Sequence, residues 1–339
     1  MDLQTVWFAA VAALWIGFLL LEGFDFGVAA LLPVLGRRTS DRHLMLRSIG
    51  PLWDGNEVWL ITAVGAVFAA FPGWYASWLP ALYLPFVLVL IGLIIRAVAF
   101  EWRHSHSTEQ WDTTWTRVVV TGSLIASLGI GAALGATTLG LPIDDAGNRV
   151  GGAFAGLGRP ALLGAVAVFG FSLVHGALFL ALKVDGDLRT RARIFAVRWS
   201  PLAALPLLAW AGLVHLRYGT PVTAVLWLVA ALAVVVAWAR IRVGREGQAF
   251  AAWGAMLVSA AATVFGAAYP VVVPSTIDPA FDLTLAEASV SDYTLTVMTW
   301  AAGVGLPVVL AYQTWTYWVF RKRLTAEPVH GEPTEAAHA

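Results

Sequence analysis

Cysteine is absent from the 339-residue sequence, and charged residues make up only 12% of it. The lack of cysteine excludes disulfides, thiolate metal sites, iron–sulfur clusters and cysteine nucleophiles. The scarcity of charge excludes a soluble domain, because roughly a quarter of the residues of a soluble domain are charged. Apolar side chains make up 59% of the chain. The composition therefore predicts an integral membrane protein.

An excess of basic residues is also missing, since 21 Lys and Arg balance 21 Asp and Glu. Without such an excess the chain cannot neutralise a phosphate backbone, so we expect no nucleic-acid partner. Tryptophan, in contrast, is abundant at 17 residues. Its amphipathic ring favours the membrane–water boundary, which again indicates a membrane protein.

Nine apolar runs are long enough to cross a bilayer core about 30 Å thick, which needs on the order of 20 helical residues. The sequence therefore predicts an all-α polytopic membrane protein with nine transmembrane helices, in two groups of four plus one. The expected spans are Thr5–Leu35, Pro51–Phe71, Ala76–Phe100, Trp115–Leu141, Pro160–Lys183, Ala196–Leu216, Pro221–Ala239, Phe250–Val272 and Tyr293–Phe320.

Basic residues concentrate in alternate connections, and the side that holds them is expected to be cytoplasmic. Three arginines fall on the opposite side: Arg149, Arg159 and Arg217. The amino terminus is therefore predicted outside and the carboxyl terminus in the cytoplasm. Seventeen of the 21 basic residues share the cytoplasmic side: Arg37, Arg38, Arg42, Arg47, Arg103, Arg117, Lys183, Arg189, Arg191, Arg193, Arg198, Arg240, Arg242, Arg245, Arg321, Lys322 and Arg323.

We expect residues 1–324 to form one membrane domain, with a first helix group at 1–141, a second at 160–272 and the ninth helix at 293–320. Residues 325–339 are polar, and we expect them to be disordered. Phe18-Leu-Leu-Leu-Glu-Gly23 resembles Phe171-Ser-Leu-Val-His-Gly176, 153 residues later. The match indicates an internal repeat, although chance similarity between two Leu- and Gly-rich helices explains it equally well.

Ionisable residues inside the spans are the candidate functional residues, because each costs at least ~2.5–3.5 kcal/mol at the bilayer centre. Glu22 and Asp25 lie three residues apart in the first span and share a face. Asp54 and Glu57 repeat this spacing in the second span. Arg96 in the third span and His175 in the fifth complete the set: four carboxylates, one permanent cation and one imidazole.

Helical rise places these carboxylates at two depths. Asp54 and Glu57 are expected roughly 5 to 10 Å below the cytoplasmic edge, and Glu22 and Asp25 roughly 18 to 22 Å below it. Such a one-sided series of titratable groups predicts a proton path from the cytoplasm. The alternative is structural: Arg96 neutralises Asp54 or Glu57, with Asn56 as a hydrogen-bond bridge between helices. His175 likewise has a structural alternative, as a neutral imidazole hydrogen-bonded in a helix interface.

A haem or metal site is not expected in this chain, because His175 and His215 do not form an obvious axial pair. Two other classes of function remain open. The same carboxylates would suit a proton-coupled secondary transporter, in which interrupted helices meet near the midplane. They would also suit a purely structural subunit, in which they serve only as helix contacts.

Two acidic motifs carry a family resemblance over the whole chain. These are Glu22-Gly-Phe-Asp25-Phe-Gly27 and Trp53-Asp54-Gly55-Asn56-Glu57-Val58-Trp59. With Tyr269-Pro270, Pro274-Ser275 and Leu295-Thr-Val-Met298-Thr-Trp300, the sequence resembles subunit II of the bacterial cytochrome bd-type quinol oxidases. Glu57 stands where some members of that family have glutamine, which adds either a titratable group or a counter-charge for Arg96.

The resemblance implies a subunit of a terminal quinol:O₂ oxidoreductase of the respiratory chain, in the bacterial cytoplasmic (inner) membrane. The b-type haems and haem d would belong to subunit I, the partner in an obligate heterodimer, and this chain would ligate none of them. The resemblance also implies a cytoplasmic proton route that includes Asp54, Asp25 and Glu22. Membrane lipid, quinol or quinone, a structural quinone with unmapped contacts, and small accessory subunits are the other expected partners.

Overall fold

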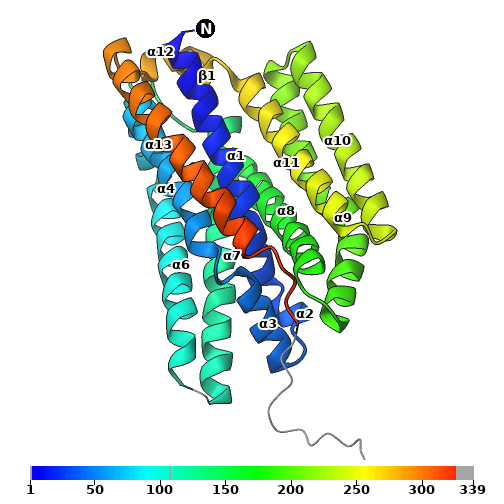
Figure 1. Ribbon diagram of the computed structural model, residues 1–339. Coiled ribbons are helices and arrows are strands. Elements are labelled where there is room, and N and C mark those ends of the chain that lie inside the picture. Colours follow the sequence, from blue (N-terminus) through cyan, green and yellow to red (C-terminus); the bar gives the residue numbers. More distant parts are fainter. Residues whose placement is uncertain (1, 107, 326–339) are drawn as a thin grey trace, which may run out of the picture.

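The computed structural model describes residues 2–106 and 108–325, and this part of the chain is mostly helical (Figure 1). Except for Thr325, the predicted disordered tail lies outside the described residues. The elements of the first half are α1 Leu3–Ala30, α2 Leu32–Leu35, α3 Thr39–Ile49, α4 Trp53–Ala70, α5 Pro72–Ala81, α6 Tyr83–Trp102, a 3₁₀ turn η1 Arg103–Ser105 and α7 Glu109–Leu139.

The second half contains four long helices, a small hairpin with short turns, and a last long helix. Its elements are α8 Arg159–Lys183, α9 Asp187–Tyr218, α10 Pro221–Arg242, α11 Glu246–Ala268, β1 Val271–Val273, η2 Pro279–Phe281, β2 Leu283–Thr284, α12 Leu285–Ala288 and α13 Asp292–Val319. Strands β1 and β2 pair antiparallel. This hairpin lies in a connection between helices and is a local departure from the predicted all-α fold.

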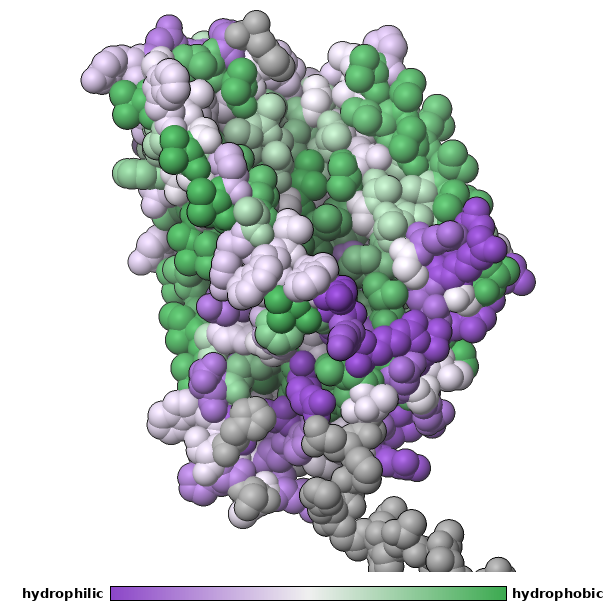
Figure 2. Space-filling model, viewed as in Figure 1, coloured by the Kyte–Doolittle hydropathy of each residue, from purple (hydrophilic) through white to green (hydrophobic). Residues whose placement is uncertain are grey.

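Eight of the described helices are long and apolar enough to cross a membrane: α1, α6, α7, α8, α9, α10, α11 and α13. The chain is therefore a multi-pass membrane protein. Figure 2 agrees with this, since apolar residues spread over the middle of the visible face and hydrophilic ones gather towards the lower end. The remaining predicted span, Pro51–Phe71, corresponds to α4, whose first residues include Asp54, Asn56 and Glu57 and are less apolar.

Two predicted spans are wrong in detail, and in both a proline accounts for the difference. The run Thr5–Leu35 was expected as one helix, but α1 ends at Ala30 and the short α2, with Pro33 in its first turn, follows. The run Ala76–Phe100 is divided between α5 and α6 at Leu82. Pro85 lacks the N–H group that would bond to the carbonyl of Ala81, so the helix breaks there.

Helices α1 and α8, which carry the two similar sequence segments, cross in close contact. A Cβ atom on Gly27 would overlap the backbone carbonyl of Ser172, and one on Gly176 would overlap the backbone of Gly27. Gly131, Gly135 and Gly164 allow a similar approach between α7 and α8. These glycines therefore allow the close helix contacts that are typical of membrane helices.

We expect Gly27→Ala to destabilise the protein by about 1–3 kcal/mol, because the added methyl group forces the α1–α8 crossing apart. The thermal unfolding midpoint of the purified protein measures this effect. Gly65→Ala is the matched control, since a Cβ atom there meets nothing within 4 Å. An unchanged midpoint for Gly27→Ala would show that the crossing is not tightly packed.

Candidate functional site

A buried ion pair joins α1 to α6 at the centre of the first group of helices. Arg96 contacts the carboxylate of Glu22 directly, and both side chains are fully buried. The same guanidinium lies 3.5 Å from Glu57 on α4, a residue that is partly exposed. The rings of Phe26 and Phe100 lie 5.0 and 5.4 Å from the guanidinium carbon. An apolar and aromatic cage therefore surrounds the only cation of the cluster.

Asn56 links three helices with its side-chain amide. Its Nδ2 donates to Asp25 Oδ2 at 2.7 Å and to the carbonyl of Leu21 at 3.2 Å, both on α1. Its Oδ1 accepts from the Tyr317 hydroxyl at 2.8 Å and from Gln313 Nε2 at 3.1 Å, both on α13. These four hydrogen bonds use both donor positions of Nδ2 and both acceptor positions of Oδ1. The residue therefore fixes the position of Asp25 and attaches α13 to the bundle.

We expect Asn56→Ala to cost about 2–3 kcal/mol of stability, since four hydrogen bonds between membrane helices contribute about 0.6 kcal/mol each. Gln313→Ala removes only one of these bonds and serves as the graded control. The thermal unfolding midpoints of the two variants compare the losses. Equal effects of the two substitutions would contradict the bridging role of Asn56.

Several polar atoms of this cluster are buried but have no hydrogen-bond partner among the described residues. They are Glu22 Oε2, Asp25 Oδ1, and Nε and Nη2 of Arg96. Each such atom carries a desolvation cost unless water or a proton donor reaches it. The cluster therefore has free positions for hydrogen bonding beside its two buried carboxyl groups.

The two sides of α1 have different roles. Glu22 and Asp25 point toward α4 and α6, where they meet Arg96 and Asn56. Gly23 and Gly27, on another face of the helix, pack against α8. The Glu-Gly-Phe-Asp-Phe-Gly motif therefore combines a charged face with a glycine face that holds α8 close.

The structure brings together Glu22, Asp25, Asn56, Glu57 and Arg96, but it places the two other predicted site residues elsewhere. Asp54 lies on the exposed surface of α4. His175 is buried in α8, and its Nε2 lies 2.9 Å from the carbonyl of Leu20. No hydrogen bond between described residues joins His175 to the cluster.

Three of the acids that were expected at two depths lie in one cluster. Asn56, in the first turn of α4, hydrogen-bonds to Asp25 near the end of α1. Glu57 and Glu22 both approach the same guanidinium. In the structure α3 lies between α2 and α4, so α4 does not follow the first span directly.

Tyr317 and Gln313 are site residues that the sequence reading missed. They lie four residues apart on α13, so they share one face. Both stand in the polar stretch Gln313-Thr-Trp-Thr-Tyr317 at the end of an apolar run. Figure 1 shows why they matter, because α13 crosses in front of α1 and brings its last turns to the level of α4.

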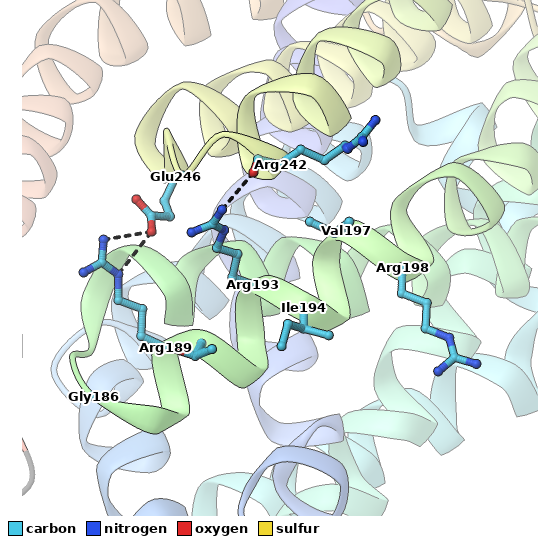
Figure 3. A pocket seen from close by; sticks show the side chains of 10 residues that line it. Gly186, Arg189, Arg193, Ile194, Val197, Arg198, Arg242 and Glu246 are labelled. Carbon is cyan, nitrogen blue, oxygen red and sulfur yellow. Dashed lines mark hydrogen bonds and ion pairs between the residues drawn. The ribbon is translucent and has the colours of Figure 1, made fainter.

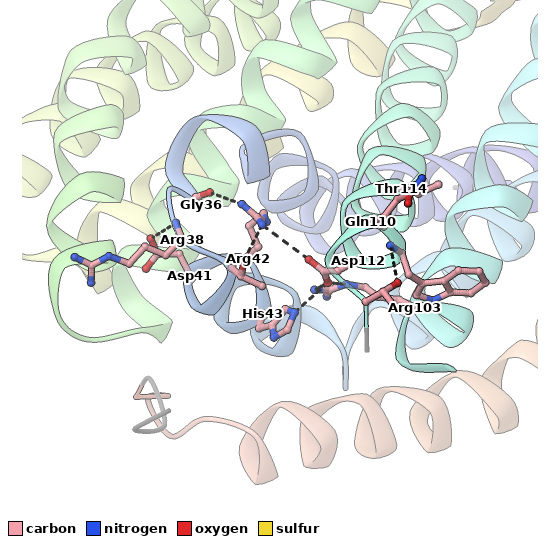
Figure 4. Close-up of polar contacts among 12 residues, drawn as sticks. Gly36, Arg38, Asp41, Arg42, His43, Arg103, Gln110, Asp112 and Thr114 are labelled. Atoms are coloured by element: carbon pink, nitrogen blue, oxygen red, sulfur yellow. Dashed lines mark hydrogen bonds and ion pairs between the residues drawn. The ribbon is translucent and has the colours of Figure 1, made fainter. Parts of the chain in front are cut away.

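At the charged end of the molecule, a second polar cluster ties α3 to α7. Figure 4 shows His43 and Arg103 both pointing toward Asp112. The Asp112 carboxylate lies 3.0 Å from His43 Nε2 and 2.7 Å from Arg103 Nη2. Arg191 on α9 adds an ion pair of 2.8 Å with Asp41 on α3. These contacts hold α3 in place beneath the buried cluster.

The two histidines considered as haem ligands, His175 and His215, each have another contact in the structure. His175 is stacked between Phe250 and Phe171, at centroid distances of 4.4 and 4.8 Å. Its Nε2 is already engaged with a backbone carbonyl, and Nδ1 of His215 lies 2.8 Å from Thr223. Within residues 2–106 and 108–325, no three His, Asp or Glu side chains are grouped so as to hold a metal ion.

Comparison with known proteins identifies the family. The model of the family described as cytochrome bd terminal oxidase subunit II matches residues 3–320. The chain is 39% identical over 338 residues to cytochrome bd ubiquinol oxidase subunit 2 of Bacillus subtilis (strain 168), with 98% of each chain covered.

A second relative is cytochrome bd-I ubiquinol oxidase subunit 2 of Escherichia coli (strain K12), 34% identical over 367 residues with 96% of each chain covered. The fold resembles a chain in the structure of bd oxidase from Geobacillus thermodenitrificans, with a TM-score of 0.78 at 18% identity. That alignment covers 94% of this chain and 99% of the other. The protein therefore belongs to the family of cytochrome bd terminal oxidase subunit II.

Proposed function

We propose that this chain is the non-haem-ligating subunit of a terminal quinol:O₂ oxidoreductase in the bacterial cytoplasmic membrane. In that role it conducts protons from the cytoplasm toward the oxygen-reducing haem of subunit I. The family assignment supports the oxidase, and the cluster of Glu22, Asp25, Glu57 and Arg96 supports the proton route. The nine spans, the two groups of four helices and the cytoplasmic carboxyl terminus are part of this proposal.

The charge count of the cluster carries the proposal. The cluster contains three carboxyl groups and one guanidinium, and two of the carboxyl groups, those of Glu22 and Asp25, are fully buried. A purely structural ion pair needs one carboxylate per guanidinium, and a further buried charge without a partner is costly. A proton route, however, needs further carboxyl groups that take up and release protons.

The exposed side of α4 gives this cluster a connection to the outside of the chain. Glu57 is 19% exposed and lies 3.5 Å from Arg96, so it reaches both the surface and the buried pair. Asp54 lies three residues earlier on the exposed side of the same helix. We infer the order Asp54, Glu57, then Glu22 and Asp25, with bound water bridging the gaps.

Subunit I is proposed to cover the surface formed by α4 and α13. Both helices expose large apolar side chains there, and Ile61 on α4 is 71% exposed. Helix α13 contributes few buried residues to this chain. A haem-bearing partner on this surface would lie within reach of the cluster, while the exposed first turn of α4, with Asp54, would stay open to the cytoplasm. Lipid, a structural quinone and small accessory subunits would occupy other parts of the surface.

The proposal is tested by Asp54→Asn in the purified oxidase complex. We expect quinol oxidation to slow by about tenfold while the haem spectrum stays unchanged, because amide groups do not carry protons. Asp145→Asn, on an exposed connection, is the matched control. Normal turnover of Asp54→Asn would favour a purely structural subunit. Purification as a lone active transporter without a haem-bearing partner would favour the transporter.

A further inference from the structure

A second concentration of charge lies far from the buried cluster, in a cavity of about 630 Å³ between α9 and the turn that joins α10 to α11. Four arginines and one glutamate line it: Arg189, Arg193, Arg198, Arg242 and Glu246. Figure 3 shows Arg189 turned toward Glu246 and Arg193 turned toward the end of α10. The proposed proton route uses none of these residues.

Three of the four arginines have no carboxylate partner among the described residues. Glu246 is paired with Arg189, with Oε1 at 2.8 Å from Nη2. Arg193 donates to the carbonyl groups of Ile241 and Arg242, at 3.0 and 2.8 Å. Carbonyl groups satisfy donors but do not neutralise charge. The cavity therefore keeps a net positive charge, which favours the binding of an anion.

The guanidinium groups of Arg198 and Arg242 lie on aromatic rings and make no hydrogen bond to another described residue. The guanidinium carbon of Arg198 lies 5.6 Å from the Trp199 ring, and that of Arg242 lies 4.4 Å from the Trp238 ring. A cation on an aromatic face keeps its N–H groups free for an acceptor. Both arginines are thus positioned but still available.

The cavity lies where the charged part of α9 meets its apolar part. Tryptophans such as Trp199 and Trp238 favour the membrane–water boundary. Large apolar side chains beside the arginines are exposed, among them Ile194 at 61% and Leu202 at 57%. An anion with an apolar portion would cover this surface, whereas a small soluble anion would leave it bare.

We propose that this cavity binds the phosphate headgroup of an anionic phospholipid, with Arg193, Arg198 and Arg242 as its ligands. Basic pockets between membrane helices on the cytoplasmic side bind such headgroups. Gly244, at φ +73 in the left-handed region, lets the α10–α11 turn close tightly beside Arg193. The acyl chains lie along the exposed apolar surface of α9.

The test is native mass spectrometry of the purified oxidase complex during titration with phosphatidylglycerol and, separately, phosphatidylcholine. We expect the double variant Arg198→Gln/Arg242→Gln to weaken phosphatidylglycerol binding about 25-fold, at about fivefold for each arginine. Phosphatidylcholine binding should not change, which verifies the folded state. Arg240→Gln is the matched control, since this exposed residue of α10 does not line the cavity.

Unchanged phosphatidylglycerol affinity in the double variant overturns the proposal, and so does an equal loss in Arg240→Gln. If the double variant does not assemble, Arg242→Gln alone, at the end of α10, should weaken binding about fivefold. Inorganic phosphate is added in a further titration. Displacement of the lipid by phosphate at comparable concentration would assign the cavity to a soluble anion, and failure to displace it supports the lipid.

Discussion

Asp25→Asn should abolish most of the turnover of the oxidase complex, with a decrease of about a hundredfold or more, the usual contribution of a positioned proton-transfer group. The substitution keeps the size of the side chain and leaves an oxygen that can accept the hydrogen bond from Asn56. It removes the capacity to take up a proton at a fully buried position. The rate of quinol-driven O₂ consumption measures the effect.

Assembly must be intact for this result to have meaning, so the haem absorption spectrum and the subunit composition are recorded in parallel. Asp145→Asn makes the same chemical change on an exposed connection and should leave turnover unchanged. Turnover of Asp25→Asn within twofold of the unsubstituted complex would exclude Asp25 from the proton route. The carboxyl group would then be only a hydrogen-bond partner of Asn56.

Arg96→Met should destabilise the subunit by about 3–5 kcal/mol, because it leaves the buried carboxylate of Glu22 without its cation. Both members of this pair are fully buried, so water cannot replace the lost interaction from bulk solvent. We expect a strongly reduced yield of assembled complex and a lower thermal unfolding midpoint.

A double variant separates the lost pair from simple misfolding. Arg96→Met/Glu22→Leu removes both charges and replaces them with apolar side chains, which is often neutral for stability. It should therefore recover most of the stability lost in Arg96→Met. If the double variant is no more stable than the single one, the pairing with Glu22 is not what makes Arg96 important.

Much of this site could be predicted from the sequence, because charged residues inside apolar runs stand out. Glu22, Asp25, Glu57 and Arg96 were recognised in this way, and the structure brings them into one cluster. Asn56 was expected to bridge helices, and it does so by hydrogen-bonding to Asp25 on α1 and to Tyr317 on α13. The membrane class of the fold followed from composition alone.

Other features could not be predicted, because they depend on contacts between distant segments. Tyr317 is uncharged and lies within the last predicted span, so nothing in its local sequence signals the hydrogen bond to Asn56, 261 positions away. The level at which α4 begins depends on the packing of α3, which hydropathy does not report. The division between α5 and α6 had a local signal in Pro85, but the length of the apolar run concealed it.

The most direct test of the proton route follows proton uptake and electron transfer in one turnover of the reduced complex with O₂. A pH indicator in the bulk phase reports protons, and haem absorbance reports electrons. For Asp25→Asn, we expect the first electron transfer to O₂ to keep its normal rate while proton uptake slows by about a hundredfold. Proton uptake at the rate of the unsubstituted complex would contradict the proposed proton route.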